Sequence, residues 1–355
     1  DTKTTELRIM KGKKKILVAM SGGVDSSVAA AVLLEQGYEV VGVTMKLWGG
    51  TSDTGCCSVS DVIDARRVAD QLGIQHHVFN FGDEFDAHVV DPYVEAHKVG
   101  ATPNPCIECN RHVKFDKLFR RATALGFELI ATGHHAQITQ QPEGFRLSRS
   151  VDLRKDQSYV LHMLSEKQLA RLQLPIGNLT KHQVREIAAS LSLQTAGKAD
   201  SQDVCFISRT KGGRQRFLEQ YMTMTPGQVI DSQGNRISNV PAVQMVTIGQ
   251  RKGLGISGEG QPRYAVDVNV ESATVTVGPK SDLYYEETPI TDIQWIGEPV
   301  TSALDIQTSA HGHTARAKIA DKIYWEKPHK KVASGQSAVF YKEDTVVGSG
   351  IVSKL

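Results

Sequence analysis

The run of residues 16–27 constrains the fold of this 355-residue chain more than any other stretch. Its first residues, Ile16 to Met20, are apolar and are typical of a buried parallel strand. Gly22 and Gly23 then predict a tight turn, and an alanine- and valine-rich run to Gln36 predicts a helix. A glycine turn at a helix start presents unpaired N–H groups and the positive end of the helix dipole. The stretch therefore predicts an anion-binding loop.

This loop differs from two common nucleotide-binding patterns. No Gly-Lys-Ser/Thr follows the glycines, as in a Walker A loop, and the G-x-G-x-x-G spacing is absent. Ser-Gly-Gly-Val-Asp-Ser instead resembles the pyrophosphate loop of enzymes that split ATP into AMP and pyrophosphate. An ordinary glycine-containing turn is the alternative, and two serines and an aspartate on the turn disfavour it. The resemblance implies that ATP, with Mg²⁺ near the aspartate, contacts Ala19, Met20, Ser21, Gly22, Gly23, Val24, Asp25 and Ser26.

Composition limits the class of protein. The length predicts about two or three domains. No apolar run reaches the length of a membrane span, and the net charge of +2 means that any nucleic-acid surface is a local patch. Five cysteines without a secretory signal favour a reducing compartment. We expect a cytoplasmic protein with no membrane contact; an organelle stays open because the chain begins without methionine.

An alternation of strands and helices follows the loop. Strands are predicted over residues 40–45 and 77–81, with an amphipathic helix over 59–72 between them. This β-α-β-α-β order is typical of a parallel α/β domain. Met45 ends the second strand, where adenine would lie in such a sheet, so it is a candidate adenine contact. A strand-end core methionine is the equally good alternative.

A Cys-x-x-Cys pair is the second strong signal. Two prolines around Asn104 stiffen a loop that presents Cys106 and Cys109. A helix predicted over residues 114–126 puts Cys109 just ahead of a helix start, where a thiolate is stabilised. A four-cysteine zinc site would need a second pair, and the adjacent cysteines at 56–57 are more consistent with a structural role.

Two later motifs are uninformative by themselves. A predicted strand ends at Gly133 and His134, where a glycine lets the backbone approach a nucleotide and a histidine can meet a base. Cys205 lies between an acidic turn and an apolar pair, which alone would favour a simply buried cysteine. Beyond residue 209 short β-branched runs and turns predict small antiparallel modules, with a basic, glycine-rich loop at 248–255 suited to a phosphate backbone.

The order of these motifs resembles the bacterial and organellar tRNA-specific 2-thiouridylases, which put sulfur on the wobble uridine of tRNA. The fold implied is α/β: an N-terminal parallel-sheet ATP-pyrophosphatase domain (1–208), a small central domain (209–280) and a C-terminal antiparallel β-barrel (281–355). The motifs that carry the resemblance are Ser21–Ser26, Asn104-Pro105 with Cys109-Asn110, Thr132–His134, Lys155–Ser158, Ser201–Asp203 with Cys205, Gly249–Gly253 and Gly335–Ser337.

The chemistry implied by the resemblance suits these residues. Oxide is a poor leaving group, so ATP adenylates the uridine C2 oxygen before sulfur attacks. Cys205 carries the sulfur as a persulfide, received from a cysteine desulfurase or a sulfur-relay protein. Cys109 is its partner, and a Cys109–Cys205 disulfide is left for a reductant. Gly133 lines the adenosine, and the implied contacts to tRNA are Asn104, Pro105, Cys106, His134, Lys155, Asp156, Gln157 and Gln336.

Two departures from the family pattern matter. Cys106 stands where most relatives carry an aspartate, and Ala320-Asp321 follows directly where some members carry an Arg-Tyr-Arg contact to tRNA. The second contact is not carried over. Cys106 opens two versions of the sulfur step: three thiols, Cys106, Cys109 and Cys205, could hold a 4Fe-4S cluster with one open iron, or Cys106 is a spare thiol beside a two-cysteine relay.

Two other functions remain open at this point. Another ATP-pyrophosphatase, such as a tRNA lysidine synthetase or an amidotransferase-type synthetase, would share the loop but would not need the pair Cys109 and Cys205. A non-catalytic RNA-binding protein with a degenerate nucleotide fold would not release pyrophosphate. Activity of the cysteine variants separates the first alternative, and pyrophosphate release separates the second.

Overall fold

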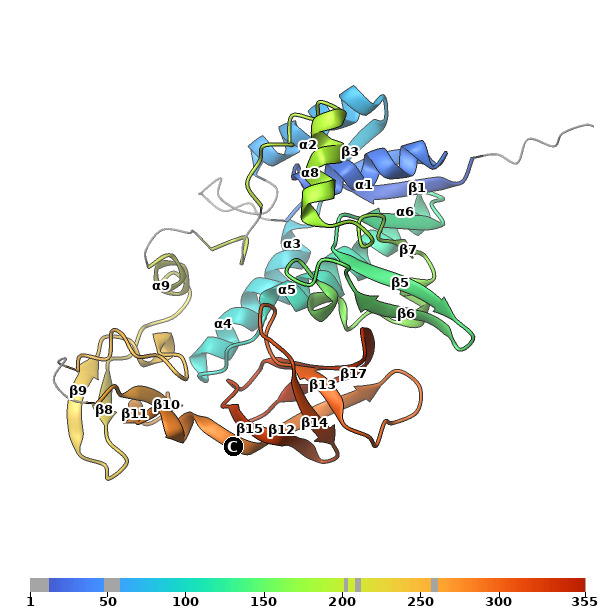
Figure 1. Ribbon diagram of the computed structural model, residues 1–355. Coiled ribbons are helices and arrows are strands. Elements are labelled where there is room, and N and C mark those ends of the chain that lie inside the picture. Colours follow the sequence, from blue (N-terminus) through green and yellow to red (C-terminus); the bar gives the residue numbers. More distant parts are fainter. Residues whose placement is uncertain (1–12, 48–57, 201–203, 208–211, 257–260, 355) are drawn as a thin grey trace, which may run out of the picture.

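The structure is a computed structural model that describes residues 13–47, 58–200, 204–207, 212–256 and 261–354. Figure 1 shows an α/β part, a small strand-rich part and a C-terminal barrel that lies against the first. The adjacent cysteines at 56–57 and the motif segment 201–203 lie outside the described residues. Within the described ranges, no helix is long and apolar enough to cross a membrane.

The α/β part is built on a five-stranded parallel sheet with the order β3-β2-β1-β4-β7. Side chains of β1 alternate between its two faces, as the pleat of a strand requires. Ile16 and Val18 pack with helices α1, α2 and α8, whereas Leu17 packs with the helices of the other face. The strands are β1 Lys15–Ala19, β2 Glu39–Lys46, β3 Gln75–Asn80, β4 Leu129–Thr132 and β7 Leu172–Gln173.

Three helices cover the first face. The sequence predicts the helix over 59–72 correctly. The last of the three helices begins with a capping box of Thr180 and Gln183. Gly73 ends the helix over 59–72 with φ of 67°, a conformation that glycine adopts at little cost. The bounds are α1 Val24–Glu35, α2 Val59–Leu72 and α8 Lys181–Ser190.

Two long helical runs cover the second face, and each contains a π-helical segment. The prediction that a loop carries the Cys-x-x-Cys pair and that the helix starts at residue 114 is wrong. Pro105 occupies the first helical position and Asn104 caps it by accepting a hydrogen bond from the Cys106 amide, so the helix begins before both cysteines. The runs are α3 Gly82–Phe85, η1 Asp86–Val90 and α4 Asp91–Lys98, and α5 Pro105–Glu108, η2 Cys109–Lys117 and α6 Leu118–Ala124.

The small part has a four-stranded sheet with the order β10-β11-β8-β9 and its own core. Val229, Val275 and Val277 are buried in that core, as expected for β-branched residues on the inner face of a sheet. The short strands predicted beyond residue 209 are present here, but β8 and β11 pair in parallel, where antiparallel pairing was expected. The bounds are α9 Gly213–Leu218, β8 Gly227–Ile230, β9 Arg236–Val240, η4 Val243–Met245, β10 Tyr264–Asn269 and β11 Thr274–Gly278.

The C-terminal part is a closed antiparallel barrel of six strands. It closes because β12 pairs with both β15 and β17. The predicted fold class, an N-terminal parallel sheet followed by a small part and a β-barrel, is therefore confirmed. The bounds are η5 Lys280–Leu283, β12 Tyr284–Trp295, β13 Leu304–Gln307, β14 Ala315–Ile319, β15 Lys322–Lys330, β16 Ser337–Lys342 and β17 Thr345–Val352.

A hairpin from the first half of the chain extends the barrel sheet, which the sequence did not predict. Strand β6 pairs with β17 through Ser148 and Thr345, and β5 pairs with β6. The sheet order is β12-β15-β14-β13-β16-β17-β6-β5. The bounds of this region are β5 Ala136–Gln141, β6 Gly144–Arg149, η3 Ser158–Leu161 and α7 Glu166–Leu169.

Two buried tyrosines join the barrel to the α/β part. Tyr159, in η3, donates a hydrogen bond to the carbonyl oxygen of Ser337 (2.9 Å). Tyr341, in β16, is 3.0 Å from the Ser158 hydroxyl through its own hydroxyl, and the Arg149 guanidinium lies 3.9 Å above its ring. Both tyrosines belong to the main core, so the barrel and the α/β part share one hydrophobic core.

We predict that Tyr159→Phe lowers the free energy of unfolding by about 1–2 kcal/mol, because a buried carbonyl of the barrel loses its donor. Tyr284→Phe, at an exposed tyrosine of β12, is the matched control and should change it little. Urea denaturation measures both. Equal stability of Tyr159→Phe and the wild type would show that this bond does not hold the barrel in place.

Candidate active site

The anion-binding loop lies between β1 and α1, as predicted. The Ser26 hydroxyl accepts a hydrogen bond from the Ser21 amide (3.1 Å) and donates one to the Gly23 carbonyl (3.2 Å). The Ser27 hydroxyl also donates to the Gly23 carbonyl (2.8 Å). Gly23 is the N-cap of α1 and supplies no side-chain cap. The first amides of α1 therefore point out of the loop without a side-chain acceptor, which is the arrangement that binds a phosphate.

Two glycines bring neighbouring elements against this loop. Gly22 has φ of 71°, and a Cβ there would lie 2.3 Å from the Asp61 carbonyl oxygen of α2. A Cβ on Gly133, just after β4, would lie 2.5 Å from the Ser26 amide nitrogen. Because β1 and β4 are adjacent parallel strands, both turns lie at the carboxyl edge of the sheet. This is the edge where open α/β sheets bind ligands.

Asp25, in the first turn of α1, is the negative centre of the site. The Lys181 ammonium donates to both of its carboxylate oxygens, at 2.7 Å each. His135 Nε2 lies 3.1 Å from one of the same oxygens. Burial acts to raise the pKa of Asp25, but the hydrogen bonds from His135 and Lys181 outweigh it and hold the pKa below its usual value. Asp25 is therefore ionised at neutral pH.

Lys181 also connects Asp25 to a second carboxylate. Its ammonium is 2.9 Å from Asp200 Oδ1, and Asp200 accepts further hydrogen bonds from Lys155 (2.7 Å) and Arg185 (2.6 Å). Burial acts to raise the pKa of Asp200, but the hydrogen bonds and charges of Lys155 and Lys181 hold that pKa far below its usual range. The result is an alternating ion chain, defined here as Lys155, Asp200, Lys181 and Asp25.

Sequence reasoning missed Lys181 and Asp200. Lys181 is the first residue of α8, where the helix dipole disfavours a cation. A lysine at a helix start is the only local signal for Lys181. Its role becomes visible only in the fold, where Asp25 and Asp200 both lie next to its ammonium.

The motif Lys155–Ser158, expected at the tRNA surface, makes many bonds inside the protein. Asp156 accepts hydrogen bonds from the Ser150 amide and from the amide and hydroxyl of Ser158. Gln157 accepts one from the His135 amide (2.8 Å) and donates its own amide to the His135 carbonyl (2.7 Å). Gln157 thereby fixes the backbone of the histidine that contacts Asp25.

The structure also describes three other residues that the sequence predicted for the site, Met45, His134 and Gln336. Met45 is the last residue but one of β2 and is buried in the main core, which is consistent with its alternative role as a core methionine. His134 Nδ1 is 2.8 Å from the Thr132 hydroxyl. The side-chain amide of Gln336 donates to the Thr102 carbonyl, so the barrel contacts the segment that leads to Asn104.

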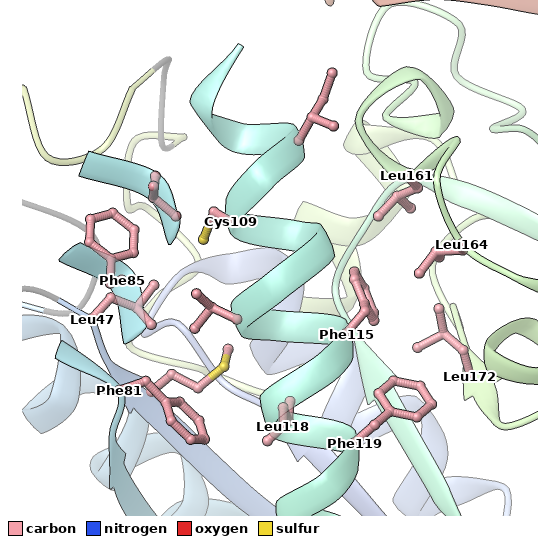
Figure 2. Packing of buried hydrophobic residues seen from close by; sticks show 14 of the residues in the cluster. Leu47, Phe81, Phe85, Cys109, Phe115, Leu118, Phe119, Leu161, Leu164 and Leu172 are labelled. Atoms are coloured by element: carbon pink, nitrogen blue, oxygen red, sulfur yellow. The ribbon is translucent and has the colours of Figure 1, made fainter. Parts of the chain in front are cut away.

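The described thiols lie around one aromatic cluster. Figure 2 shows Cys109 on the buried side of its helix, facing the segment that carries Phe85. Cys205 packs against the same core, and its neighbour Phe206 stacks edge-on against Phe85 (5.4 Å) and Tyr93 (5.7 Å). Burial raises the pKa of Tyr93, and the nearby Cys106 adds to this effect. Cys106, Cys109 and Cys205 are reduced thiols in this structure.

The carboxylate of Asp25 has the donor chemistry that suits Mg²⁺. Proteins bind Mg²⁺ with one or two carboxylates plus substrate phosphates. Asp25 supplies such a carboxylate beside the loop amides, and the Lys181 ammonium already holds the place of a cation there. In contrast, within the described ranges no three His, Cys, Asp or Glu side chains are grouped as metal ligands. We therefore derive no step through a 4Fe-4S cluster.

We predict that Gly133→Ala destabilises the protein by about 1–3 kcal/mol, because the new methyl group overlaps the first turn of α1. Gly197→Ala is the matched control, since a Cβ there meets open space. Chemical denaturation compares the two. Equal stability of both variants would contradict the close approach of β4 to the loop.

Three family models match consecutive parts of the chain. Their descriptions are tRNA methyl transferase HUP domain (residues 14–209), tRNA methyl transferase PRC-barrel domain (215–279) and Aminomethyltransferase beta-barrel domain (286–352). The first alone covers more than half of the chain. The solved "U34-tRNA thiolase NcsA from Methanococcus maripaludis", which holds a 4Fe-4S cluster, is 18% identical over 60% of this chain and 66% of its own. Its TM-score of 0.37 is too low to support a functional inference.

Full-length relatives are more informative. A Chloroflexus aurantiacus protein named tRNA-specific 2-thiouridylase MnmA is 41% identical over 353 residues, 96% of this chain and 98% of the relative. Clostridium perfringens and Acetivibrio thermocellus proteins of the same name are 41% and 42% identical, over 97% and 96% of this chain and 99% of each relative. The methyl transfer that the family descriptions mention does not recur in these names. With its loop, ion chain and thiols on one fold, the chain belongs to the tRNA-specific 2-thiouridylases, a family of sulfurtransferase enzymes.

Proposed function

We propose that this protein converts the wobble uridine of a tRNA to 2-thiouridine, consuming ATP and releasing AMP and pyrophosphate. The observation that carries the proposal is the uncapped start of α1 beside Asp25, on the same domain as Cys109 and Cys205. A phosphate site would let ATP activate the C2 oxygen of uridine. The two thiols, which pack against the same hydrophobic core, would deliver the sulfur. Similarity over the full chain favours this function over a lysidine synthetase or an amidotransferase-type synthetase.

The nucleotide would lie across the loop at the carboxyl edge of the sheet. The first amides of α1 and the hydroxyls of Ser21 and Ser26 bind the phosphates that leave as pyrophosphate. Asp25 holds Mg²⁺, which neutralises charge on those phosphates when it is bound. Gly133 lines the adenosine, and its lack of a side chain lets β4 lie against the loop, because a Cβ there would be 2.5 Å from the Ser26 amide nitrogen.

The sulfur step uses the two cysteines in a balanced sequence. The terminal sulfur of the Cys205 persulfide attacks C2 of the adenylated uridine, and AMP leaves with the oxygen. The Cys109 thiolate then attacks the Cys205 Sγ and breaks the persulfide S–S bond. The electron pair stays on the sulfur bound to C2, which becomes the thiocarbonyl. A Cys109–Cys205 disulfide remains, and a thiol reductant restores both cysteines.

The tRNA would contact Lys155 and the helix start at Asn104, Pro105 and Cys106. The Lys155 side chain is 42% exposed, so it is open to a phosphate. His134 and this helix start meet the target base, which must leave the anticodon stack. Asp156, Gln157 and Gln336 would support tRNA binding indirectly. Their side chains are bonded within the protein and hold neighbouring residues of the site in place. A cysteine desulfurase or sulfur-relay protein loads Cys205.

We predict that Asp25→Asn abolishes tRNA-dependent release of pyrophosphate, because the amide keeps the shape of the carboxylate but cannot hold Mg²⁺. Glu39→Gln is the control; its carboxylate pairs with Lys15 at the opposite edge of the sheet. An enzyme-coupled pyrophosphate assay with ATP and a tRNA transcript measures both. Release that survives Asp25→Asn would refute the nucleotide site, and no release by the wild type would leave only an RNA-binding function.

We predict that Cys205→Ser blocks both persulfide loading and thiolation, whereas Cys109→Ser allows loading but stops transfer. Alkylation mapping after treatment with a cysteine desulfurase locates the persulfide, and mass analysis of tRNA measures 2-thiouridine. A persulfide mainly on Cys56 or Cys57 would contradict the relay. Full activity of both serine variants would instead favour another ATP-pyrophosphatase.

Iron analysis of the protein purified without oxygen separates the two sulfur versions. Iron-free protein that thiolates tRNA supports the cysteine relay. Activity that follows the iron content and falls in Cys106→Asp would support the 4Fe-4S version and overturn the relay.

A further inference from the structure

The ion chain joins two parts of the site that the proposed function uses separately. Lys155 is its exposed end, and Asp25 is its end at the nucleotide loop. Between them the Lys181 side chain is only 10% exposed, and Asp200 is 22% exposed. A change at the exposed end therefore reaches Asp25 through groups that water screens little.

Lys181 is bonded to the Asp25 carboxylate, which the proposed function assigns to the metal ion of the nucleotide. Its ammonium lies 2.7 Å from both oxygens of Asp25, so a metal ion and Lys181 compete for the same acceptors. Asp200 offers Lys181 a second position, because one of its oxygens is already 2.9 Å from the ammonium. The other oxygen of Asp200 is taken by Lys155 at 2.7 Å.

We propose that Lys181 is a positioning residue that couples the binding of tRNA to the binding of the magnesium nucleotide. When a tRNA phosphate draws Lys155 away from Asp200, Asp200 loses one of its three cations and attracts Lys181 more strongly. Lys181 then shifts from Asp25 toward Asp200, and Asp25 is open to the metal ion. This proposal rests on the proposed function, which places Mg²⁺ at Asp25 and tRNA at Lys155.

The coupling must act in both directions. A nucleotide that takes Asp25 from Lys181 increases the positive charge at Asp200, which weakens the hold of Asp200 on Lys155 and frees Lys155 for the tRNA. Arg185 keeps Asp200 in place throughout, because its guanidinium also donates to the carbonyls of Ala196 and Lys198. Asp200 itself leads directly into the segment that carries Cys205.

The coupling is measured by binding alone. α,β-Methylene-ATP cannot transfer its adenylyl group, so its dissociation constant with Mg²⁺ is determined calorimetrically with and without a saturating unmodified tRNA transcript. We expect tRNA to tighten wild-type binding of this analogue by about 5-fold or more, the usual lower range of coupling between sites.

Two substitutions separate positioning from a general structural role. In Lys181→Met the effect of tRNA should fall below about 2-fold, and the tRNA-free protein should bind the analogue at lower Mg²⁺, because no ammonium competes for Asp25. In Lys155→Met the tRNA-free protein should likewise bind the analogue more tightly. Simple damage to the site would weaken binding instead. Lys15→Met, which removes a lysine paired with Glu39 at the opposite edge, should retain the wild-type coupling.

The outcomes are distinct. Wild-type binding of the analogue that tRNA changes by less than about 2-fold overturns the coupling and leaves the proposed function intact. Full coupling in Lys181→Met also overturns it. If Lys181→Met does not fold, Lys155→Met decides, since that side chain is at the surface. A wild type that binds neither tRNA nor the analogue overturns both the proposed function and the coupling.

Discussion

The contact of one buried ammonium with two carboxylates is the interaction on which the site depends. Lys181 brings Asp25, at the start of α1, and Asp200, at the end of the α/β part, to the same point. Taking such charges out of water costs several kcal/mol per ion, and their attraction only roughly repays it. A buried ion pair is therefore a poor source of stability. Under the proposed function, the position of Lys181 beside the loop is explained by binding, because a metal ion can take Asp25 when Lys181 leaves it.

The sequence predicted the fold of the loop between β1 and α1 well, because its signals are local. A buried strand, two glycines and a helix start are contiguous, and they fold as expected around Gly22 and Gly23. The predicted start of the helix at residue 114 failed for an equally local reason. Prolines argued for a loop, but Pro105 at a first helical position and Asn104 as its cap are also a normal helix start.

What the sequence could not give is pairing over long distances. Lys181 contacts Asp25 across more than 150 residues of chain, and no sequence pattern near either residue predicts this contact. The hairpin β5–β6 joins the barrel because Ser148 aligns with Thr345, far along the chain. Asp156 and Gln157, expected on the tRNA surface, bond inward for the same reason: their partners become neighbours only in the fold.

These long-distance contacts give the barrel a role in the chemistry even without a contact to the base. Ser334 and Gln336 bond the two sides of Thr102, and Asn104 two residues later caps the helix that carries Cys106 and Cys109. Tyr341 meets Ser158, the last residue of the motif that begins with Lys155. The barrel therefore fixes both the thiol-bearing helix and the start of the ion chain. A thiolation site needs such rigidity, because an activated base and a persulfide react only when they are held at close range.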